Sequence, residues 1–537
     1  MRTRLALAVV AALAVSACGS TIQQTSSSTL GGTTGDGLGA SSGDATGDGG
    51  TTGPGSSTSG GSGGSGAGTT GTSGSTGSTG FSTDGSTGFG TTGSGSDGSS
   101  GIDTTGSTPL PSQAATGLGV TAKTISIGIG YSSDGDAANA AIGAGSFTQG
   151  DERASTQALV DEINQHGGIA GRKLVPVFHA YNVTSATPGT TQDQAACDDW
   201  TADHKVIAVM SSSLTATLVA CLKQRGVVYL KAGQIVEADQ TYLRVYPNQL
   251  LLATMSQDRI FTDQAKAFQR QKYFTGWNTV NGTPGAKTKV GVITYDTDSF
   301  TRSLRNVILP ALKAAGHAPA EADVIQVKKV QQQSDTAGTT AQIKSAVLRL
   351  QSDGVTHVVL GDASAFIMEF FAANARTQGY FPRLGVTSGA APEAVYEAGL
   401  ATAQQLNGIS GNGWLPTLDL PAADAAKYSN SQAKRCLEIL KRRTGQQFSS
   451  ANEATIALSD CDSMFMFQKA LSLAPALSPD GLLAGFDKLG SSYVSPTVGP
   501  TFVSARQHDT AVQAWDLNWN AACTCVKYTS KRRVPSL

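Results

Sequence analysis

Charge is scarce in this sequence of 537 residues, and neither sign prevails. Only 15% of the residues are Asp, Glu, Lys or Arg, and the formal net charge is −1 at pH 7. Proteins that bind nucleic acids usually carry a basic patch or stripe, and no block of like charge is found along this chain. The composition therefore argues against nucleic acid as a partner.

Sequence motifs for catalysis, cofactors and metals are also missing. The six histidines are scattered, without an HExxH motif or a close pair that could hold a metal. Gly128 and Gly130 follow strand-forming residues, but no third glycine completes the dinucleotide-binding GxGxxG motif, and no P-loop is present. A GxSxG string at 60–64 lies in a Gly/Ser-rich stretch instead of at a strand-to-helix turn. We therefore expect neither an enzyme nor a bound cofactor or metal.

The N-terminus has the order of an export signal. The apolar run at 5–15 is well short of the roughly 20 residues that a transmembrane helix needs. Arg2 and Arg4 precede it, and Ser16-Ala17-Cys18 follows, which resembles a bacterial lipoprotein signal whose cysteine is acylated. We expect residues 1–18 to be a signal peptide, with Cys18 anchoring the protein to the extracytoplasmic face of the cell membrane. A simple secretory signal with a chance cysteine is the alternative.

Residues 19–117 consist almost entirely of Gly, Ser and Thr, with a few Asp. This segment holds so few aliphatic and aromatic side chains that it cannot bury a core, and we expect it to be disordered. A coil of about 95 residues has a root-mean-square span of roughly 50–55 Å. The segment is therefore predicted to be a tether between the membrane and a folded domain, with a glycosylated or adhesive stalk as the alternative.

Cysteine is rare but informative. If Cys18 carries lipid, six cysteines remain, and an even number in an oxidising compartment suggests disulfides. Proximity in the sequence favours two pairs, Cys197–Cys221 and Cys436–Cys461.

The last two cysteines, Cys523 and Cys525, are separated by a single residue. This spacing leaves open a labile disulfide or a pair of thiols. A metal site is less favoured, because no second Cys or His cluster accompanies them.

Beyond residue 120, β-branched apolar runs alternate with helical periodicity. Strands are expected at 124–130, 174–180, 206–210 and 227–230, and helices at 149–166, 193–203 and 215–225. The rhythm restarts with strands at 290–295, 324–330 and 357–360, and helices at 300–315, 340–351 and 365–377. Further helices are expected at 437–441 and 454–473, and late strands at 513–519 and 525–528. This pattern predicts an α/β protein with two doubly wound lobes, whose strand C-termini face a shared crevice.

One local motif is specific. Asp161-Glu162-Ile163-Asn164 is followed by Gly167-Gly168-Ile169-Ala170-Gly171-Arg172-Lys173-Leu174. This resembles the E-I-N-x-x-G-G-I-x-G-R-x-L signature of type I periplasmic solute-binding proteins, which include the leucine/isoleucine/valine-binding family of ABC importers.

The resemblance implies a Rossmann-like fold of two lobes joined by three crossovers. Within a solute-binding domain at 118–537, lobe one would comprise 120–247 and 384–504, and lobe two 248–383 and 505–537. The ligand would bind between the lobes, and closure about the hinge would bury it.

The resemblance also implies which residues line the cleft. They are Tyr131, Ser132, Ser211, Ser212, Ser213, Thr215, Ala232, Gly233, Asp296, Phe300, Asp362 and Ser388. The hydroxyls at 211–215 lie between a strand and a helix, where free backbone N–H groups suit a carboxylate. An ordinary helix N-cap is the alternative there. Phe300 would replace the aromatic residue that family members place against the ligand.

The sequence leaves more than one ligand class open. Family members that bind amino acids place an acid near position 388 to pair with the ammonium group, and this chain has no carboxylate there. Asp362 is the possible substitute. A carboxylate, an amide or another small polar solute fits as well as an amino acid.

The sequence therefore predicts a lipid-anchored extracytoplasmic protein that captures a small polar solute for an ABC-type importer. The membrane and a permease would be its partners. The alternative is a tethered surface sensor or an adhesive lipoprotein that uses the same fold without transport.

Overall fold

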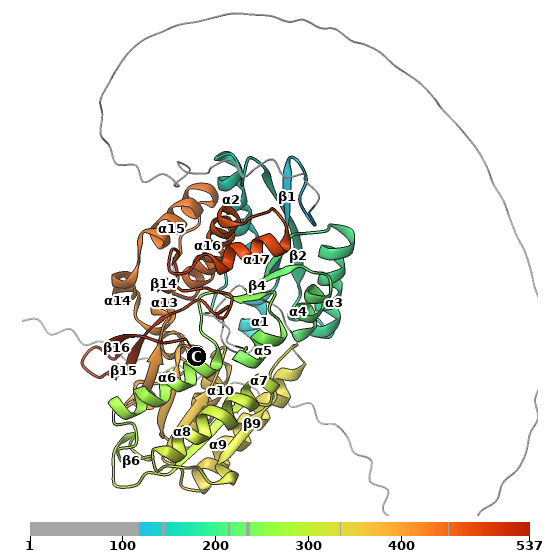
Figure 1. Ribbon diagram of the computed structural model, residues 1–537. Helices are drawn as coiled ribbons and strands as arrows, with labels where there is room; N and C mark the ends of the chain where they lie inside the picture. Colours follow the sequence, from blue (N-terminus) through green and yellow to red (C-terminus); the bar gives the residue numbers. More distant parts are fainter. Residues whose placement is uncertain are drawn as a thin grey trace, which may run out of the picture. The chain divides into compact units, whose positions relative to one another are not determined.

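The computed structural model describes residues 117–536, except 142, 144, 146, 213, 214, 232–236, 333, 449 and 450 (Figure 1). The predicted signal peptide, Cys18 and nearly all of the Gly/Ser/Thr-rich segment lie outside the described residues.

A parallel five-stranded sheet forms the first lobe, in the order β2-β1-β3-β4-β5. The strands are β1 Thr124–Ser132, β2 Lys173–Tyr181, β3 Ala208–Ser211, β4 Val228–Lys231 and β5 Gln249–Leu251. In β1, Ile125, Ile127 and Ile129 alternate with small residues and are buried on one face. This alternation, together with β-branching, explains why the segment forms a strand.

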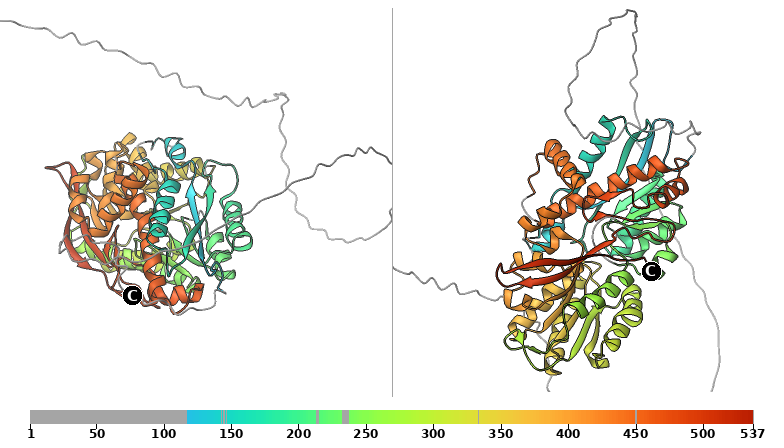
Figure 2. Two further views of the ribbon diagram at one scale, coloured as in Figure 1. Left: turned by 90° about the horizontal axis from the view of Figure 1, so that it is seen from above. Right: turned by 60° about the vertical axis from the view of Figure 1, so that its left-hand side comes forward.

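Helices cover both faces of this sheet (Figure 2). On the face of the three β1 isoleucines lie α2 Glu152–Gln165, α15 Ser431–Thr444, α16 Ala451–Leu473 and α17 Pro479–Asp487. On the other face lie α3 Gly189–Asp198, the π-helical turn Asp199–Asp203 and α4 Ala216–Gln224. The lobe is completed by the short helices α1 Gly135–Ala141 and α5 Gln240–Val245 and the strands β13 Val494–Ser495 and β14 Gly499–Pro500.

The second lobe is built on a seven-stranded sheet in the order β16-β15-β12-β11-β10-β8-β9. Its strands are β8 Val290–Tyr295, β9 Val324–Val327, β10 His357–Gly361, β11 Arg383–Thr387, β12 Ser410–Gly413, β15 Gln513–Asn520 and β16 Cys525–Arg533. The five strands β8 to β12 are parallel, and the β15–β16 hairpin adds two antiparallel strands at one edge.

Helices also cover this second sheet. They are α6 Gln257–Arg270, α7 Asp298–Ser303, α8 Leu309–Ala314, α9 Asp335–Ser352, α10 Phe366–Thr377 and α11 Pro392–Glu397. A π-helical turn at Leu304–Ile308 joins α7 to α8, so the single helix expected at 300–315 is divided. Smaller elements are α12 Ala403–Leu406, α13 Pro416–Asp419, α14 Ala422–Ala425, β6 Trp277–Asn278, β7 Thr283–Pro284 and 3-10 turns at Glu321–Asp323, Ser388–Ala390 and Ala426–Tyr428.

The boundary between the lobes differs from the one we expected. We placed 384–504 in lobe one, but β11 and β12 pair with β10 and belong to the second sheet. The chain returns to the first lobe only with α15. The strand β12 has the sequence Ser-Gly-Asn-Gly and no apolar pattern. A Cβ added at Gly411 would lie 1.7 Å from the Val386 carbonyl oxygen, so only glycine fits at this position. The close approach of the neighbouring backbone requires small residues in this strand, so a search for apolar residues does not detect it.

Two of the crossovers between the lobes run side by side. The Leu251 N–H donates to the His508 carbonyl at 2.8 Å, and the Thr510 N–H donates to the Leu251 carbonyl at 3.2 Å. The Ala511 N–H donates to the Thr254 carbonyl at 2.9 Å. The first and third crossovers are therefore joined as a short hydrogen-bonded ribbon.

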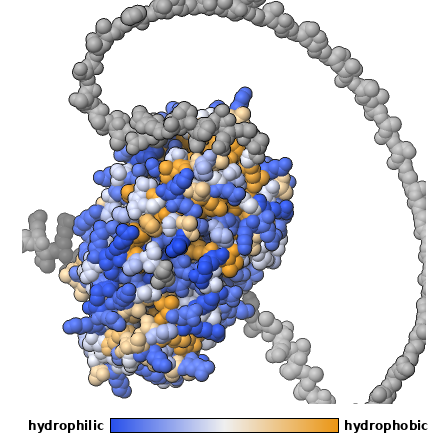
Figure 3. All heavy atoms as spheres, viewed as in Figure 1, coloured by the Kyte–Doolittle hydropathy of each residue, from blue (hydrophilic) through white to orange (hydrophobic). Residues whose placement is uncertain are grey.

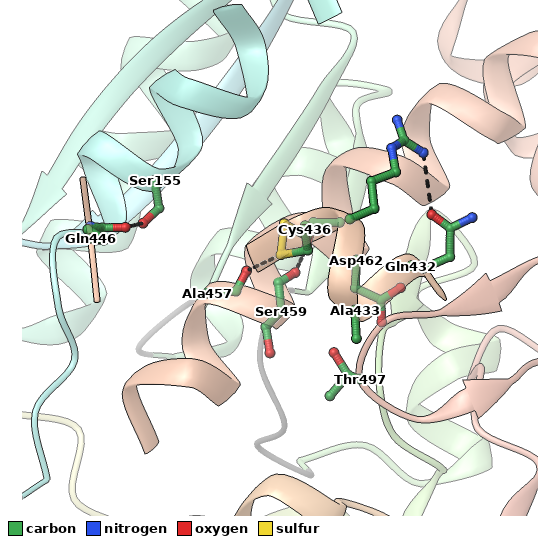
Figure 4. The surroundings of a disulfide bond; sticks show 12 residues. Ser155, Gln432, Ala433, Cys436, Gln446, Ala457, Ser459, Asp462 and Thr497 are labelled. Carbon is green, nitrogen blue, oxygen red and sulfur yellow. Dashed lines mark hydrogen bonds between the residues drawn. A yellow bond between two sulfur atoms is a disulfide. The ribbon is translucent and has the colours of Figure 1, made fainter. Parts of the chain in front are cut away.

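The described residues contain three disulfides, including both pairs that sequence proximity favoured. Cys197–Cys221 joins α3 to α4, and Cys436–Cys461 joins α15 to α16. Figure 4 shows the surroundings of the second, where the Ser155 hydroxyl of α2 bonds to Gln446 at 3.0 Å. The third disulfide, Cys523–Cys525, lies in the turn of the β15–β16 hairpin.

An apolar groove lies on the helical surface of the second lobe. It is lined by residues of α6, the 304–308 turn, α8 and their surroundings, and Figure 3 shows exposed hydrophobic residues in this region. None of the predicted site residues lines it. Within the described part of the chain, no helix has both the length and the apolar character needed to cross a membrane.

Candidate functional site

Polar side chains gather where the strands of the first sheet end. Ser132, Ser211 and Lys231 are the last residues of β1, β3 and β4. Ser211 and Lys231 are register partners on neighbouring strands, so their side chains leave the same face of the sheet. Ligands of doubly wound sheets bind at this carboxyl edge.

Ser211 lies in a tightly packed position. Only 1% of the residue is exposed, and a Cβ added at Gly130 would lie 2.2 Å from the Ser211 Oγ. The Tyr229 hydroxyl donates to the Ser211 carbonyl at 2.8 Å. The neighbouring Tyr181 keeps its proton, because burial and the Asp193 carboxylate raise the pKa of its hydroxyl well above the usual value. This corner therefore supplies hydroxyl groups in a region with little water.

Thr215 acts as the N-cap of α4. Its N–H and its hydroxyl both donate to Asp193 Oδ2, at 2.7 and 2.6 Å, and its Oγ1 accepts from the Thr217 N–H at 3.1 Å. The structure thus supports the N-cap interpretation for Thr215. Ser212 is exposed, whereas Ser213, Ala232 and Gly233 lie outside the described residues.

Tyr131 and Ser132 belong to opposite faces of β1. The Tyr131 ring packs edge-on against Phe178, with centroids 6.1 Å apart. The Ser132 N–H donates to Glu152 Oε2 at 3.0 Å. Burial, together with the charges of Asp136 and Asp151, raises the pKa of Glu152 to about 6. Sequence reasoning missed this carboxyl group, which lies in the first turn of α2.

Lys231 is a second residue that sequence reasoning missed. Its side chain is only 5% exposed, and its Nζ donates to Glu237 Oε2 at 2.8 Å. Burial opposes the charge of Lys231, but the Glu237 carboxylate outweighs burial and raises the pKa of the amine. Lys329 of lobe two also pairs with Glu237. Burial alone would raise the pKa of Glu237, but the charges of the two lysines outweigh burial and lower this pKa to about 2.

A second ion pair joins the lobes near the first. Arg302 of α7 binds Asp239 of lobe one through Nε at 2.5 Å and Nη2 at 2.9 Å. Asp239 also accepts from the Tyr242 N–H at 2.8 Å as the N-cap of α5. The segment after β4 therefore contacts lobe two through two carboxylates, and each has a lobe-two cation as a partner.

In lobe two, the residues predicted after β8 separate in the structure. Asp296 is exposed, directly after the strand. Phe300 is 1% exposed and packs against Tyr295 and Phe261, with ring centroids 5.3 and 6.3 Å apart. The prediction for Phe300 is corrected, because the first turn of α7 directs this side chain into the core of lobe two.

Asp362 organises the loop between β10 and α10. Its Oδ1 accepts from the Ala363 and Ser364 N–H groups at 2.7 and 3.2 Å and from the Tyr295 hydroxyl at 3.0 Å. Its Oδ2 accepts from the Met368 N–H at 2.9 Å. Burial raises the pKa of Asp362 to about 6, although these hydrogen bonds oppose the shift. Both oxygens of Asp362 are thus engaged within lobe two.

Another carboxyl group lies close to this loop. Glu369, in the first turn of α10, is 9% exposed. Burial and the nearby Asp362 raise the pKa of Glu369 to about 8, so this side chain is mostly neutral at pH 7. The sequence alone offered no reason to single out Glu369, since its burial depends on the packing of α10.

Ser388 is buried in a polar network of lobe two. Its Oγ accepts from the Trp414 N–H at 2.7 Å and donates to the Asp419 carboxylate, which the Tyr528 hydroxyl also contacts. Burial raises the pKa of Asp419 to about 7. A carboxyl group, Asp419, thus contacts the Ser388 hydroxyl, and both residues are shielded from solvent. Among the described residues, no group of three or more His, Cys, Asp or Glu side chains could hold a metal ion.

Residues 124–522 match the family model for periplasmic binding proteins. The chain belongs to this family. The match extends from β1 to the β15–β16 turn, so in this periplasmic binding protein it includes the whole first sheet and every strand of the second sheet except β16. Family members act outside the cytoplasm, and the chain has the type I fold of this family.

Solved structures with the same fold cover most of this periplasmic binding protein. A possible leucine/isoleucine/valine-binding protein from Rhodopirellula baltica SH 1 has a TM-score of 0.52 at 13% identity, covering 76% of this chain and 96% of that chain. A solute-binding protein of an ABC transporter from Rhodopseudomonas palustris HaA2, in complex with p-hydroxybenzoic acid, has a TM-score of 0.54 at 13% identity, covering 77% and 98%.

A third structure is the substrate-binding protein of a branched-chain amino acid transporter from Streptococcus pneumoniae, in complex with isoleucine. Its TM-score is 0.50 at 18% identity, and the alignment covers 77% of this chain and 99% of that chain. At these identities the likeness shows the fold alone. A comparison with curated protein sequences gave no significant match.

Proposed function

We propose that this periplasmic binding protein captures a small solute with a carboxylate group in the cleft between its lobes and delivers it to an ABC-type importer. The observation that carries the proposal is the pairing of Ser211 and Lys231 at the carboxyl edge of the first sheet. A hydroxyl group and a buried ammonium group at the ends of neighbouring strands, on one face of the sheet, suit an anionic oxygen.

The ligands named for two structural relatives agree with this chemistry. The protein from Rhodopseudomonas palustris binds p-hydroxybenzoic acid, and the protein from Streptococcus pneumoniae binds isoleucine. Both molecules carry a carboxylate, and only isoleucine carries an ammonium group. The shared carboxylate is the feature we transfer to this chain.

Recognition of an ammonium group needs an acid, and two candidates replace the one missing at Ser388. Glu152 lies next to Ser132 in lobe one, and Glu369 lies next to Asp362 in lobe two. A bound ammonium group would favour the ionised form of either side chain. Amino acids are therefore retained as ligands beside simple aromatic and aliphatic carboxylates.

We also propose that acylated Cys18 anchors the protein and that residues 19–117 tether the solute-binding domain to the membrane. The residues around Cys18 and the Gly/Ser/Thr-rich composition support this arrangement. The length of the segment would also suit a second function, that of a tethered surface sensor. We prefer transport, because the family match extends over both lobes.

A thermal-shift experiment with matched ligands tests the proposal. Isoleucine is compared with isoleucinamide, which lacks the carboxylate, and with 3-methylpentanoate, which lacks the ammonium group. The same comparison is made between 4-hydroxybenzoate and 4-hydroxybenzamide. A ligand at 100 times its Kd stabilises the protein by about 2.7 kcal/mol. We expect shifts with the carboxylates and none with the amides.

Variants then locate the binding site. Lys231→Met is expected to weaken binding of the carboxylate roughly 10- to 100-fold, because a hydrogen bond to a charged group contributes about 1.5–3 kcal/mol. The control Lys344→Met changes an exposed lysine of α9 and should leave affinity unchanged. Stabilisation by the amides alone, or equal binding by Lys231→Met, would contradict the proposal. No binding by any solute would favour the sensor.

A further inference from the structure

The turn between β15 and β16 carries the most accessible disulfide of the protein's described residues. Cys525 is the register partner of Asn520, the last pair of the hairpin, and residues 521–524 form an exposed turn. Cys523 is among these exposed residues and is bonded to Cys525, which is 5% exposed. The hairpin projects from the edge of the second sheet (Figure 1).

The other two disulfides have the opposite environment. Cys197, Cys436 and Cys461 are wholly buried, and Cys221 is 8% exposed. Each of these bonds joins two helices of lobe one, across 24 or 25 positions of sequence. An attacking thiol must reach a sulfur atom along the line of the S–S bond. The packed helices of lobe one prevent this approach, whereas the turn at Cys523 leaves it open.

The hairpin does not depend on its disulfide. Cysteines two positions apart close almost no loop, so the bond restricts the unfolded chain very little. The two strands are held by a ladder of backbone pairs from Gln513 to Asn520. Arg532 of β16 also binds Asp263 of α6 and Asp516 of β15. Opening the disulfide therefore leaves β16 in its place.

The backbone conformation at Thr524 is a further feature of the Cys523–Cys525 turn. Thr524, the residue between the two cysteines, has φ of 49°, in the left-handed region that a β-branched residue rarely adopts. Such strain persists only where the surrounding structure imposes it. Thr524 lies inside the short covalent ring that the disulfide closes, so opening the disulfide removes one constraint on this conformation.

From these observations we propose that Cys523–Cys525 is a thiol–disulfide exchange site that reacts selectively with a dithiol, while the two buried disulfides stay intact. One thiolate of the dithiol attacks Sγ of Cys523, the bond between Cys523 and Cys525 breaks, and Cys525 leaves as a thiolate that takes up a proton. The second thiol of the dithiol, as a thiolate, then attacks the dithiol sulfur of the mixed disulfide, the bond from that sulfur to Cys523 breaks, and Cys523 leaves as a thiolate that takes up a proton. The dithiol ends as a disulfide, and two electrons and two protons have passed to Cys523 and Cys525.

The first experiment measures selectivity in the intact protein. Samples are incubated with increasing dithiothreitol for fixed times, free thiols are trapped with N-ethylmaleimide, and labelled peptides are quantified by mass spectrometry. We expect Cys523 and Cys525 to be labelled at least tenfold faster than Cys197, Cys221, Cys436 and Cys461. Simultaneous labelling of all three pairs, or earlier labelling of either buried pair, would overturn the proposal.

A second experiment measures transfer of oxidising equivalents. The untreated protein is mixed with a reduced dithiol peptide, and the disulfide formed in the peptide is quantified. We expect about one peptide disulfide for each protein molecule, and none with the variant Cys523→Ser/Cys525→Ser. That variant should keep the wild-type melting temperature, since the hairpin does not depend on the bond. Equal oxidation by the double variant would also overturn the proposal. The result is independent of solute binding.

Discussion

Arg259 Nη1 lies 2.9 Å from Asp509 Oδ2, and neither side chain is exposed to solvent. Arg259 lies in the first turn of α6 in the second lobe, and Asp509 lies in the third crossover. The same guanidinium donates to the Val534 and Pro535 carbonyls, each at 3.0 Å. The Ser256 N–H in the first crossover donates to Asp509 at 2.5 Å. One buried ion pair thus connects two crossovers with the C-terminal segment.

We predict that Arg259→Met lowers the free energy of unfolding by about 3–5 kcal/mol, because it leaves Asp509 as an unpaired buried charge. Urea denaturation measures the change. The control is Arg349→Met, which removes an exposed pair with Asp353 at 3.9 Å and should change stability by less than about 0.5 kcal/mol. A loss as small as that of the control would show that the Arg259–Asp509 pair is not important for stability.

Glu237 predicts a loss of stability in acid. Its pKa is lowered to about 2 in the folded protein from an ordinary 4.5, so the folded state binds fewer protons than the unfolded state between these values. Its contribution, on the order of 3 kcal/mol, is complete above pH 4.5 and lost as the pH falls toward 2. The free-energy difference between wild type and Glu237→Gln should therefore shrink from pH 5 to pH 2 in urea denaturation. A constant difference would contradict the assigned pKa.

Glu369 predicts the opposite dependence. Burial raises its pKa to about 8 from an ordinary 4.5, so the folded state binds more protons between these values. Its carboxyl group therefore costs stability as the pH rises from 4.5 through 8. We expect Glu369→Gln to stabilise the protein at pH 8, on the order of 3 kcal/mol, and to have little effect at pH 4. Thermal melts at both pH values test this, with Glu321→Gln, an exposed position, as the control.

A fourth prediction concerns the contribution of the disulfide between α15 and α16 to the free energy of unfolding. Cys436→Ser/Cys461→Ser opens a link across 25 positions and should lower the free energy of unfolding by about 3 kcal/mol in the chain-entropy model. Guanidinium denaturation of both proteins under oxidising conditions measures the loss. Removal of Cys523 and Cys525 should cost far less, and equal costs would contradict the loop-length argument.

Much of the fold was predictable because local patterns carry it. The strand at 290–295 was predicted with the bounds it has, since it is rich in β-branched and aromatic residues, and all six of its residues are buried in the structure. The helix at Glu152–Gln165 ends at the glycines that follow it, and both favoured disulfides formed between neighbouring helices. The strand β12 was missed, because its Gly and Ser residues are selected by backbone contact with β11 instead of by hydrophobicity.

The site was predicted less well, for a different physical reason. The edge of the first sheet follows from strand order, so Ser132 and Ser211 were correctly placed at strand ends. Lys231 was missed because a buried lysine depends on Glu237 and on Lys329 from the other lobe. Phe300 was misassigned because one turn of helix decides whether an aromatic side chain points to a cleft or into a core.

The late return of the chain to the first lobe has a consequence for synthesis. One face of β1 is covered by α15, α16 and α17, which follow the whole parallel part of the second sheet in the sequence. The second sheet is complete only after β15 and β16, which come late in the sequence, have been synthesised. Neither lobe is formed by a single uninterrupted segment, so we expect a growing or C-terminally truncated chain to expose an apolar sheet face until nearly all of it is present. We therefore expect the nascent protein to be prone to aggregation until its synthesis is nearly complete, and a chain divided between its lobes to fold poorly.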